Sequence, residues 1–222
     1  MSLKKIFALG IGHNTPVSLD LALACDYVIE GLFHFEDGRT GNVDHGFQVL
    51  GSYADLFKRE SLEGMNFLLT MGDNKIRAEL VSRILAKGGC VPTLIHPTAV
   101  ISHFANISET GVSIYPFSYV QADSVVGRNT VILSHVNISH NVTIGENCFF
   151  AGGSTIGAYA NVGDNVFVGQ GALIISSKVK CVGKNAFIGA RSLVTKDVPE
   201  NAIVAGVPIG RLLSQIGMCH EA

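Results

Sequence analysis

The stretch Val131–Gln170, VILSHVNISHNVTIGENCFFAGGSTIGAYANVGDNVFVGQ, has a branched aliphatic residue or a phenylalanine at every sixth position. The same column continues in both directions, and its members are Ile114, Val120, Val126, Ile132, Ile138, Ile144, Phe150, Ile156, Val162, Val168 and Ile174. A period of six is neither that of a helix nor that of an ordinary strand. It predicts a solenoid in which short parallel strands wind around a triangular prism, with one inward-pointing residue on each side.

Two further columns of the repeat agree with this fold. Two positions before each apolar residue stands a side chain small enough for a tight corner, at Ser118, Ser124, Thr130, Val136, Val142, Cys148, Ser154, Ala160, Val166 and Ala172. Three positions after it come turn formers that tolerate left-handed backbone angles, at Asp123, Asn129, Asn141, Asn147, Gly153, Asn165 and Gly171. Since three sides make one coil, residues eighteen positions apart are predicted to stack.

The repeat is interrupted twice. It slips by one residue near Gly111 and by two residues around Ser176-Ser177. Insertions in a solenoid usually form outward loops, and such loops often face a ligand. Outside the main column the register holds at Ile101, Ile107, Val182, Ile188 and Val194.

Residues 1–95 have a different pattern, in which short apolar runs alternate with helical segments. Strands are predicted at Lys4–Leu9, Tyr27–Ile29, Gln48–Leu50 and Asn66–Met71, and helices at Pro16–Ala24 and Asn74–Lys87. This alternation predicts a small parallel sheet of Rossmann-like type. The chain is therefore predicted to be mainly β, with an α/β domain over 1–95 and a β-helix with a C-terminal tail over 96–222.

Composition excludes several classes of protein. With 222 residues, 47% of them apolar, the chain suffices for two domains of ordinary size without disorder. A net charge of -2 makes a nucleic acid an unexpected partner. Five scattered cysteines without a CxxC motif favour reduced thiols in a cytoplasm. No apolar run reaches transmembrane length, so no membrane insertion is expected.

Several short strings, taken with the repeat, carry a resemblance to a known family. They are Gly10-Ile11-Gly12, Val49-Leu50-Gly51-Ser52, Met71-Gly72-Asp73-Asn74 with Arg77, His96-Pro97-Thr98-Ala99-Val100, His140–Gly145 and Ala205–Pro208. The chain resembles the hexapeptide-repeat acyltransferases with a left-handed β-helix, and within them the bacterial group that acetylates nucleotide-linked amino sugars or sialic acid. The resemblance implies a homotrimer, acetyl-CoA in the groove between two β-helices, and an N-terminal domain that holds the nucleotide of the acceptor.

Acetyl transfer needs a base, and His140 is the candidate. It lies two residues after Ile138, in an outward column, and an imidazole takes up a proton near neutral pH. It matches the family's histidine, four residues before an Ile-Gly pair, although an exposed histidine on a coil is the simpler interpretation without the resemblance. Many members carry an acidic residue next, where this chain has Asn141, whose carbonyl oxygen accepts a hydrogen bond without charge. A second histidine of some relatives is Phe149 here.

The other reactants also have candidate residues. Ala158 is eighteen residues after His140, and its backbone N–H is a candidate oxyanion donor or else an ordinary ladder bond. Cys148 occupies a corner column, which favours direct transfer without an acyl-enzyme. Arg211 is the candidate cation for the CoA phosphates. Close approach of the pantetheine arm is expected at Gly152, Gly153, Gly157, Gly169 and Gln170.

A nucleotide site is predicted where the strands of the α/β domain end, since ligands meet open parallel sheets there. The alternative roles of these residues are solvated loops and a helix N-cap at Asp73 or Asn74. The candidates for binding the acceptor are Gly10, Gly12, His13, Glu36, Asp37, Gly72, Asp73 and Asn74.

The sequence thus favours an acetyl-CoA-dependent N-acetyltransferase acting on a nucleotide-linked amino sugar, a 4-amino-4,6-dideoxy sugar, for surface glycan synthesis. No resident metal is expected. The short tail after Val194 favours acetyl over long acyl chains. Three alternatives remain: sialic acid O-acetylation, a binder inactivated by Asn141 and Phe149, and a zinc enzyme of the γ-carbonic anhydrase kind. The zinc ligands would be His135 and His140, with His103 or His96.

Overall fold

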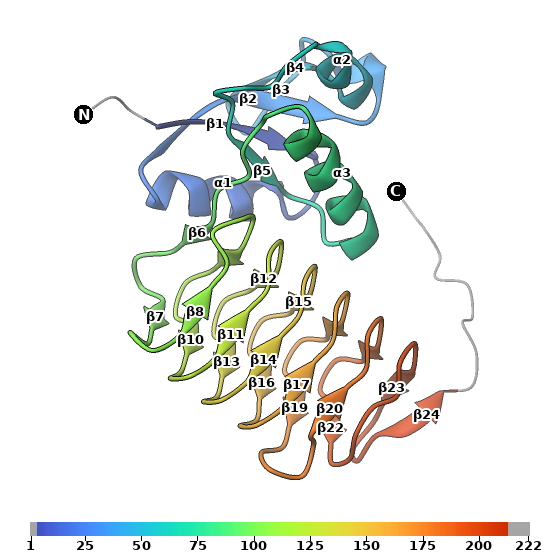
Figure 1. Cartoon of the computed structure of the whole chain (residues 1–222). Coiled ribbons are helices and arrows are strands. Elements are labelled where there is room, and N and C mark those ends of the chain that lie inside the picture. Colours follow the sequence, from blue (N-terminus) through green and yellow to red (C-terminus); the bar gives the residue numbers. More distant parts are fainter. Residues whose placement is uncertain (1–3, 213–222) are drawn as a thin grey trace.

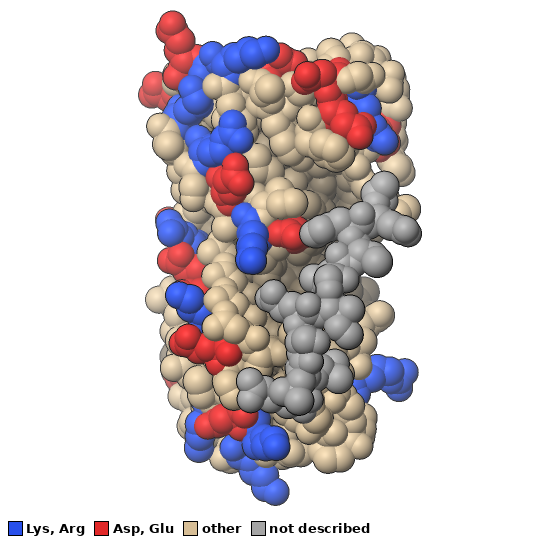
Figure 2. All heavy atoms as spheres, turned by 90° about the vertical axis from the view of Figure 1, so that its right-hand side faces the viewer, with Lys and Arg blue, Asp and Glu red and all other residues tan. Residues whose placement is uncertain are grey.

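The structure is a computed structural model that describes the backbone of residues 4–212 and the side chains of residues 4–210. A small α/β part lies at one end of a long β-helix, whose coils follow one another toward the C-terminus (Figure 1). The predicted fold class, mainly β with a parallel β-helix after a small α/β part, is confirmed. On the face shown in Figure 2, acidic and basic side chains are interspersed rather than gathered by sign.

The α/β part contains one five-stranded sheet with the order β3-β4-β2-β1-β5, parallel except for β3. Its elements are β1 (Lys4–Leu9), α1 (Thr15–Ala24), β2 (Tyr27–His34), a 3-10 turn η1 (Asp37–Arg39), β3 (Val43–Asp44), β4 (Phe47–Ser52), α2 (Tyr53–Lys58), β5 (Phe67–Leu69) and α3 (Asn74–Ala86). The predicted strands and helices are all present; β1 has the predicted bounds, and the others have shifted ends.

Helix α2 was not predicted, although the sequence holds its signal. The Ser52 hydroxyl accepts a hydrogen bond from the Asp55 N–H at 3.1 Å, and the Asp55 carboxylate accepts one from the Ser52 N–H at 3.2 Å. This reciprocal pair is a capping box, and it satisfies two donors that a helix start leaves unpaired.

The β-helix has three faces, each a sheet of short parallel strands whose pairing follows the predicted repeat of eighteen. Face 1 contains β6 (Leu94–Ile95), β9 (Ser113–Ile114), β12 (Val131–Ile132), β15 (Phe149–Phe150), β18 (Phe167–Val168), β21 (Phe187–Ile188), β23 (Ile203–Ala205) and the antiparallel β24 (Gly210–Leu212). Face 2 contains β7 (Val100–Ile101), β10 (Tyr119–Val120), β13 (Asn137–Ile138), β16 (Thr155–Ile156), β19 (Leu173–Ile174) and β22 (Leu193–Val194). Face 3 contains β8 (Asn106–Ile107), β11 (Val125–Val126), β14 (Thr143–Ile144), β17 (Asn161–Val162) and β20 (Cys181–Val182).

The core of the β-helix corrects one prediction. The apolar column is buried as expected, but the small column two positions earlier is buried as well. Each side therefore contributes two inward residues rather than one, because the chain turns inward at the corner and again on the strand. Two hydroxyls of the small column donate to carbonyls: Ser118 Oγ to the Leu133 oxygen at 2.9 Å, and Ser124 Oγ to the Ser139 oxygen at 2.8 Å. The buried Ser154 hydroxyl has no hydrogen-bond partner among the described residues.

The turn formers mark three corners, where the backbone adopts positive φ as predicted. The asparagine corner, between faces 3 and 1, comprises Asn129, Asn147, Asn165, Asn185 and Asn201. The histidine corner, between faces 2 and 3, comprises His140, Asn141, Ala158, Tyr159, Ser176 and Ser177. The third corner, between faces 1 and 2, comprises Phe117, His135, Gly153, Gly171 and Arg191. Backbone hydrogen bonds stack successive coils at each corner.

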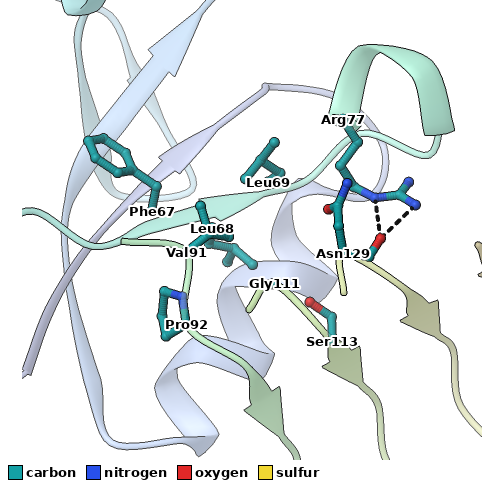
Figure 3. A pocket seen from close by; sticks show the side chains of 9 residues that line it. All are labelled: Phe67, Leu68, Leu69, Arg77, Val91, Pro92, Gly111, Ser113 and Asn129. Atoms are coloured by element: carbon teal, nitrogen blue, oxygen red, sulfur yellow. Dashed lines mark hydrogen bonds between the residues drawn. The ribbon is translucent and has the colours of Figure 1, made fainter. Parts of the chain in front are cut away.

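The α/β part is fixed to the β-helix by Arg77 of α3, which is buried (Figure 3). Its guanidinium donates to the carbonyl oxygen of Asn129 at 3.2 and 3.3 Å and to that of Cys148 at 3.1 Å. Asn74, at the start of the same helix, donates to the carbonyl oxygens of Asn165 and Val166, both at 3.4 Å. The cavity beside Arg77 has a volume of only about 10 Å³, too small for a substrate.

Candidate active site

His140 lies exposed at the histidine corner, two residues after the buried Ile138 of β13. Its Nδ1 is 2.9 Å from the side-chain oxygen of Asn141. A carboxamide oxygen only accepts hydrogen bonds, so Nδ1 carries the proton of the neutral ring and Nε2 keeps its lone pair. The pair therefore has the arrangement that a general base needs: one nitrogen held and the other open to solvent.

Tyr159 belongs to this site, although the sequence analysis did not select it. Its ring lies edge-on to the His140 ring with centroids 5.2 Å apart, and Lys180 Nζ is 5.9 Å from its centroid. Tyr159 has a φ of 66° and is half exposed. A tyrosine in a column of asparagine and glycine was the available signal, since bulky residues rarely adopt positive φ.

The N–H of Ala158, the predicted oxyanion donor, is already engaged. It donates to the hydroxyl oxygen of Ser176 at 3.0 Å. This contact is to a side chain one coil further along, so the N–H is neither free nor part of the backbone ladder.

The insertion predicted around Ser176-Ser177 forms a loop between β19 and β20 at the histidine corner. It carries the exposed Lys178 and Lys180, and the carboxylate of Asp197 accepts hydrogen bonds from the N–H groups of Lys180 and Cys181 at 2.6 and 3.0 Å. Two cations thus stand on the same corner as His140. The predicted phosphate ligand Arg211 lies in β24, but its side chain is outside the described residues.

The residues predicted to face the cofactor, four glycines and Gln170, divide between two corners. Gly157 lies beside Ala158 at the histidine corner, where an added Cβ would stand 2.4 Å from the Ser176 nitrogen. At the third corner, across face 2 from His140, are Gly152, Gly153, Gly169 and Gln170. Within one chain the structure therefore brings Gly157 to His140 and keeps the other four away from it.

The predicted acceptor residues gather at one edge of the α/β sheet. Gly10, Gly12 and His13 follow β1, Glu36 and Asp37 follow β2, and Gly72, Asp73 and Asn74 follow β5. These strands are neighbours in the sheet, so all three loops meet at its carboxyl edge.

Several of these residues have structural partners. Asp73 caps α3, accepting from the N–H groups of Lys75 and Ile76 at 2.8 and 3.0 Å. Asn74 joins the two parts of the molecule, as described above. Glu36 pairs with Arg39 at 3.5 Å. Gly12 and His13 are exposed and open to a ligand.

The loop after β5 lies over face 1 of the β-helix. A Cβ added at Gly72 would be 3.8 Å from the Phe149 ring, which stacks on Phe167 with centroids 5.4 Å apart. Phe149 is buried, so it packs between the two parts of the molecule. Since the corner opposite face 1 of a triangular prism is the histidine corner, the carboxyl edge and His140 of one chain lie on opposite sides.

His135 and His140, the first two zinc ligands of the metal alternative, lie on different corners. His135 stacks on Phe117, with ring centroids 5.2 Å apart. Within the described part of the chain, no three His, Cys, Asp or Glu side chains are grouped to hold a metal ion.

Comparisons with known proteins agree with this fold. The family of bacterial transferase hexapeptide proteins (six repeats) matches residues 123–158. GDP-perosamine N-acetyltransferase of Escherichia coli O157:H7 is 28% identical over 216 residues, covering 94% of this chain and 95% of that protein.

Two solved structures extend the comparison. PerB from Caulobacter crescentus, in complex with CoA and GDP-perosamine, is 24% identical with a TM-score of 0.85, covering 95% of this chain and 98% of that one. The acetyltransferase domain of PglB from Neisseria gonorrhoeae, in complex with acetyl coenzyme A, is 27% identical with a TM-score of 0.59, covering 94% and 99%.

The fold, the repeat and these relatives make the chain similar to the hexapeptide-repeat acyltransferases with a left-handed β-helix. Within that class it resembles the nucleotide-sugar N-acetyltransferases. No helix in the described residues is long and apolar enough to span a membrane.

Proposed function

We propose that this protein transfers the acetyl group of acetyl-CoA to the amino group of a nucleotide-linked 4-amino-4,6-dideoxy sugar. The observation that carries the proposal is the His140–Asn141 pair, with Nδ1 held at 2.9 Å and Nε2 open at an exposed corner. The full-length similarity to GDP-perosamine N-acetyltransferase supports the choice of acceptor.

In this reaction the amine of the sugar attacks the thioester carbonyl carbon, and His140 Nε2 accepts the proton that the amine loses. The tetrahedral oxyanion then collapses and expels the CoA thiolate. Asn141 holds the ring in the tautomer that accepts at Nε2. A general base positioned in this way typically raises the reaction rate by about 10²- to 10⁴-fold.

Direct transfer, without an acyl-enzyme, is supported by the state of Cys148. Its side chain is buried, and its thiol donates to the Gly163 carbonyl oxygen at 3.2 Å. Burial raises the pKa of this thiol to about 12, so it stays protonated at neutral pH and is a poor nucleophile.

Acetyl-CoA is proposed to lie along the histidine corner, with its thioester at His140. Successive coils are about 4.8 Å apart. Lys178 and Lys180, two coils beyond His140, are therefore placed for the CoA phosphates, with Arg211 as a further candidate. Exposed lysines on an inserted loop support this placement.

We propose that the active unit is a homotrimer. Because the carboxyl edge of the sheet lies over face 1 and His140 lies on the opposite corner, an acceptor bound at this edge meets His140 of a neighbouring chain. A second chain is then proposed to line the groove with its third corner, at Gly152, Gly153, Gly169 and Gln170.

The product is proposed to feed the synthesis of a surface polysaccharide from the cytoplasm. The four cysteines in the described part of the chain are unpaired, which supports a reducing compartment.

The test is CoA release from acetyl-CoA with UDP-, GDP- and dTDP-linked 4-amino sugars and with free sialic acid as acceptors. We expect turnover with one amino sugar and a loss of about 10²-fold or more in His140→Ala. His135→Ala is the matched control, since His135 is also an exposed histidine at a corner, and it should keep its activity.

Three results would count against the proposal. Absence of turnover with every amino sugar in a folded protein contradicts the acceptor, and turnover with sialic acid alone assigns the O-acetyltransferase reaction. Full activity in a monomer, measured by sedimentation under assay conditions, contradicts the two-chain site.

A further inference from the structure

At two corners of this β-helix, a backbone N–H that has no partner in the backbone ladder donates to a side chain of the next coil. At the asparagine corner the Glu146 N–H donates to a carboxylate oxygen of Asp164 at 2.8 Å. At the histidine corner the Ala158 N–H donates to Ser176 Oγ at 3.0 Å. Both pairs are eighteen residues apart, so the two contacts are equivalent in the repeat.

The two acceptors differ in whether they can also donate a hydrogen bond. A carboxylate has no proton to donate, whereas a serine hydroxyl that accepts one hydrogen bond still has its own proton. Ser176 is exposed and begins the inserted loop. Within the described residues no acceptor lies in reach of its hydroxyl proton, so that proton is available to a ligand at the histidine corner.

We infer that the Ser176 hydroxyl, rather than the Ala158 N–H, is the group that donates to the acyl oxygen during transfer. The inference rests on the proposed function. Ser176 Oγ occupies the position 3.0 Å from the Ala158 nitrogen that an acyl oxygen would otherwise take. The acyl oxygen therefore meets the hydroxyl first.

The donation fits the chemistry of the step. As the amine bonds to the carbonyl carbon, the C=O electron pair moves to oxygen, and the Ser176 O–H donates to that oxyanion without transferring its proton. The Ala158 N–H withdraws density from the same hydroxyl, and such chained hydrogen bonds strengthen one another. Collapse restores the C=O bond, expels the CoA thiolate and leaves Ser176 unchanged.

Kinetics with the best amino-sugar acceptor test the role. Removing one oxyanion donor typically lowers kcat by about 10²- to 10³-fold. We expect a smaller loss in Ser176→Ala, about 10- to 100-fold, because the Ala158 N–H is uncovered, with the KM for the acceptor unchanged. Ser176→Thr keeps the hydroxyl and should retain most activity, and Ser177→Ala is the matched control. Activity in Ser176→Ala within twofold of the wild type, or above it, overturns the inference.

A second measurement needs no acceptor and separates this inference from the proposed function. Infrared difference spectra of bound acetyl-CoA, labelled with ¹³C at the acetyl carbonyl, report donation to that oxygen. We expect a lower carbonyl frequency in the wild type than in Ser176→Ala, and no change in Ser177→Ala. Equal frequencies in wild type and Ser176→Ala contradict the role of Ser176, whereas failure of the wild type to bind acetyl-CoA contradicts the proposed function itself.

Discussion

The asparagine corner and the histidine corner have the same backbone conformation, but their side chains have different roles. Asn147 and Asn141, six residues apart, have φ angles of 59° and 56°. At the asparagine corner the amides bond to each other, as Asn129 Nδ2 does to Asn147 Oδ1 at 2.7 Å, and the carbonyls accept from Arg77. At the histidine corner the amide of Asn141 serves His140 instead, and both side chains are exposed.

At the asparagine corner, which the α/β part contacts, the position with positive φ holds an asparagine in each coil from Asn129 to Asn201. At the open histidine corner the equivalent position holds Asn141, Tyr159 and Ser177 in successive coils, and His140 stands one position earlier. A residue such as Tyr159 at positive φ costs about 1–2 kcal/mol relative to asparagine or glycine. Its presence at the open corner therefore points to a use other than stability.

The largest expected effect tests the covered corner. Arg77→Met leaves the Asn129 and Asn147 carbonyls without their donor, whereas the Cys148 carbonyl still accepts from the Val131 N–H at 2.9 Å. Each buried unsatisfied carbonyl costs about 1–3 kcal/mol. We expect a loss of about 3 kcal/mol in the free energy of unfolding, measured by urea denaturation. The loss arises at the junction between the two parts. The urea concentration at the midpoint of unfolding should therefore fall for both the α/β part and the β-helix.

Arg83→Met is the matched control on the same helix. Arg83 is half exposed, lies over the Phe57 ring at 3.9 Å and pairs with Glu79 at 3.6 Å. Its loss is expected to cost less than about 1 kcal/mol, since exposed ion pairs contribute little. Equal effects of the two substitutions would show that Arg77 is not the clamp between the parts.

The β-helix was predictable almost to the residue, because a six-residue period leaves no freedom in register. A shift by one position would turn Ile138 outward. The corners followed from the same constraint, since asparagine and glycine at one position predict positive φ there. The exposure of His140 was thus a consequence of the repeat.

What the sequence could not supply were contacts between distant coils and between the two parts. The bond from Arg77 to the Asn129 carbonyl joins residues 52 apart, and a carbonyl acceptor leaves no mark on side-chain identity. The hydrogen bond from the Ala158 N–H to Ser176 depends on the conformation of the inserted loop, which the repeat does not predict. The boundary between residues 95 and 96, and the roles of the acceptor-binding residues, stay predictions.

A smaller effect is expected when the open corner loses its hydrogen-bond acceptor. Asn141→Ala removes the contact to His140 Nδ1 and frees the ring to rotate, so we expect kcat to fall about tenfold. Because Asn141 has a φ of 56°, which alanine adopts less readily, the free energy of unfolding should also fall by about 1 kcal/mol. Asn141→Asp keeps an acceptor and adds charge, which favours the imidazolium form. The acidic limb of its pH–rate profile should therefore move to higher pH. Unchanged kcat in Asn141→Ala would show that the pair does not orient the base.

Exchanging the corners' residues gives the smallest effect and the most direct test of the comparison. Tyr159→Asn makes the open corner resemble the covered one and should stabilise the protein by about 1 kcal/mol, because asparagine accepts positive φ more readily than tyrosine while the contact with the His140 ring is lost. The reverse change, Asn165→Tyr, should destabilise it by a similar or larger amount. Tyr159 also packs against His140, so the stabilised variant is expected to have a lower kcat in the same assay that measures CoA release. If Tyr159→Asn gained stability and kept full activity, the aromatic residue would be a neutral feature of the open corner, and the strain at that position would need another explanation.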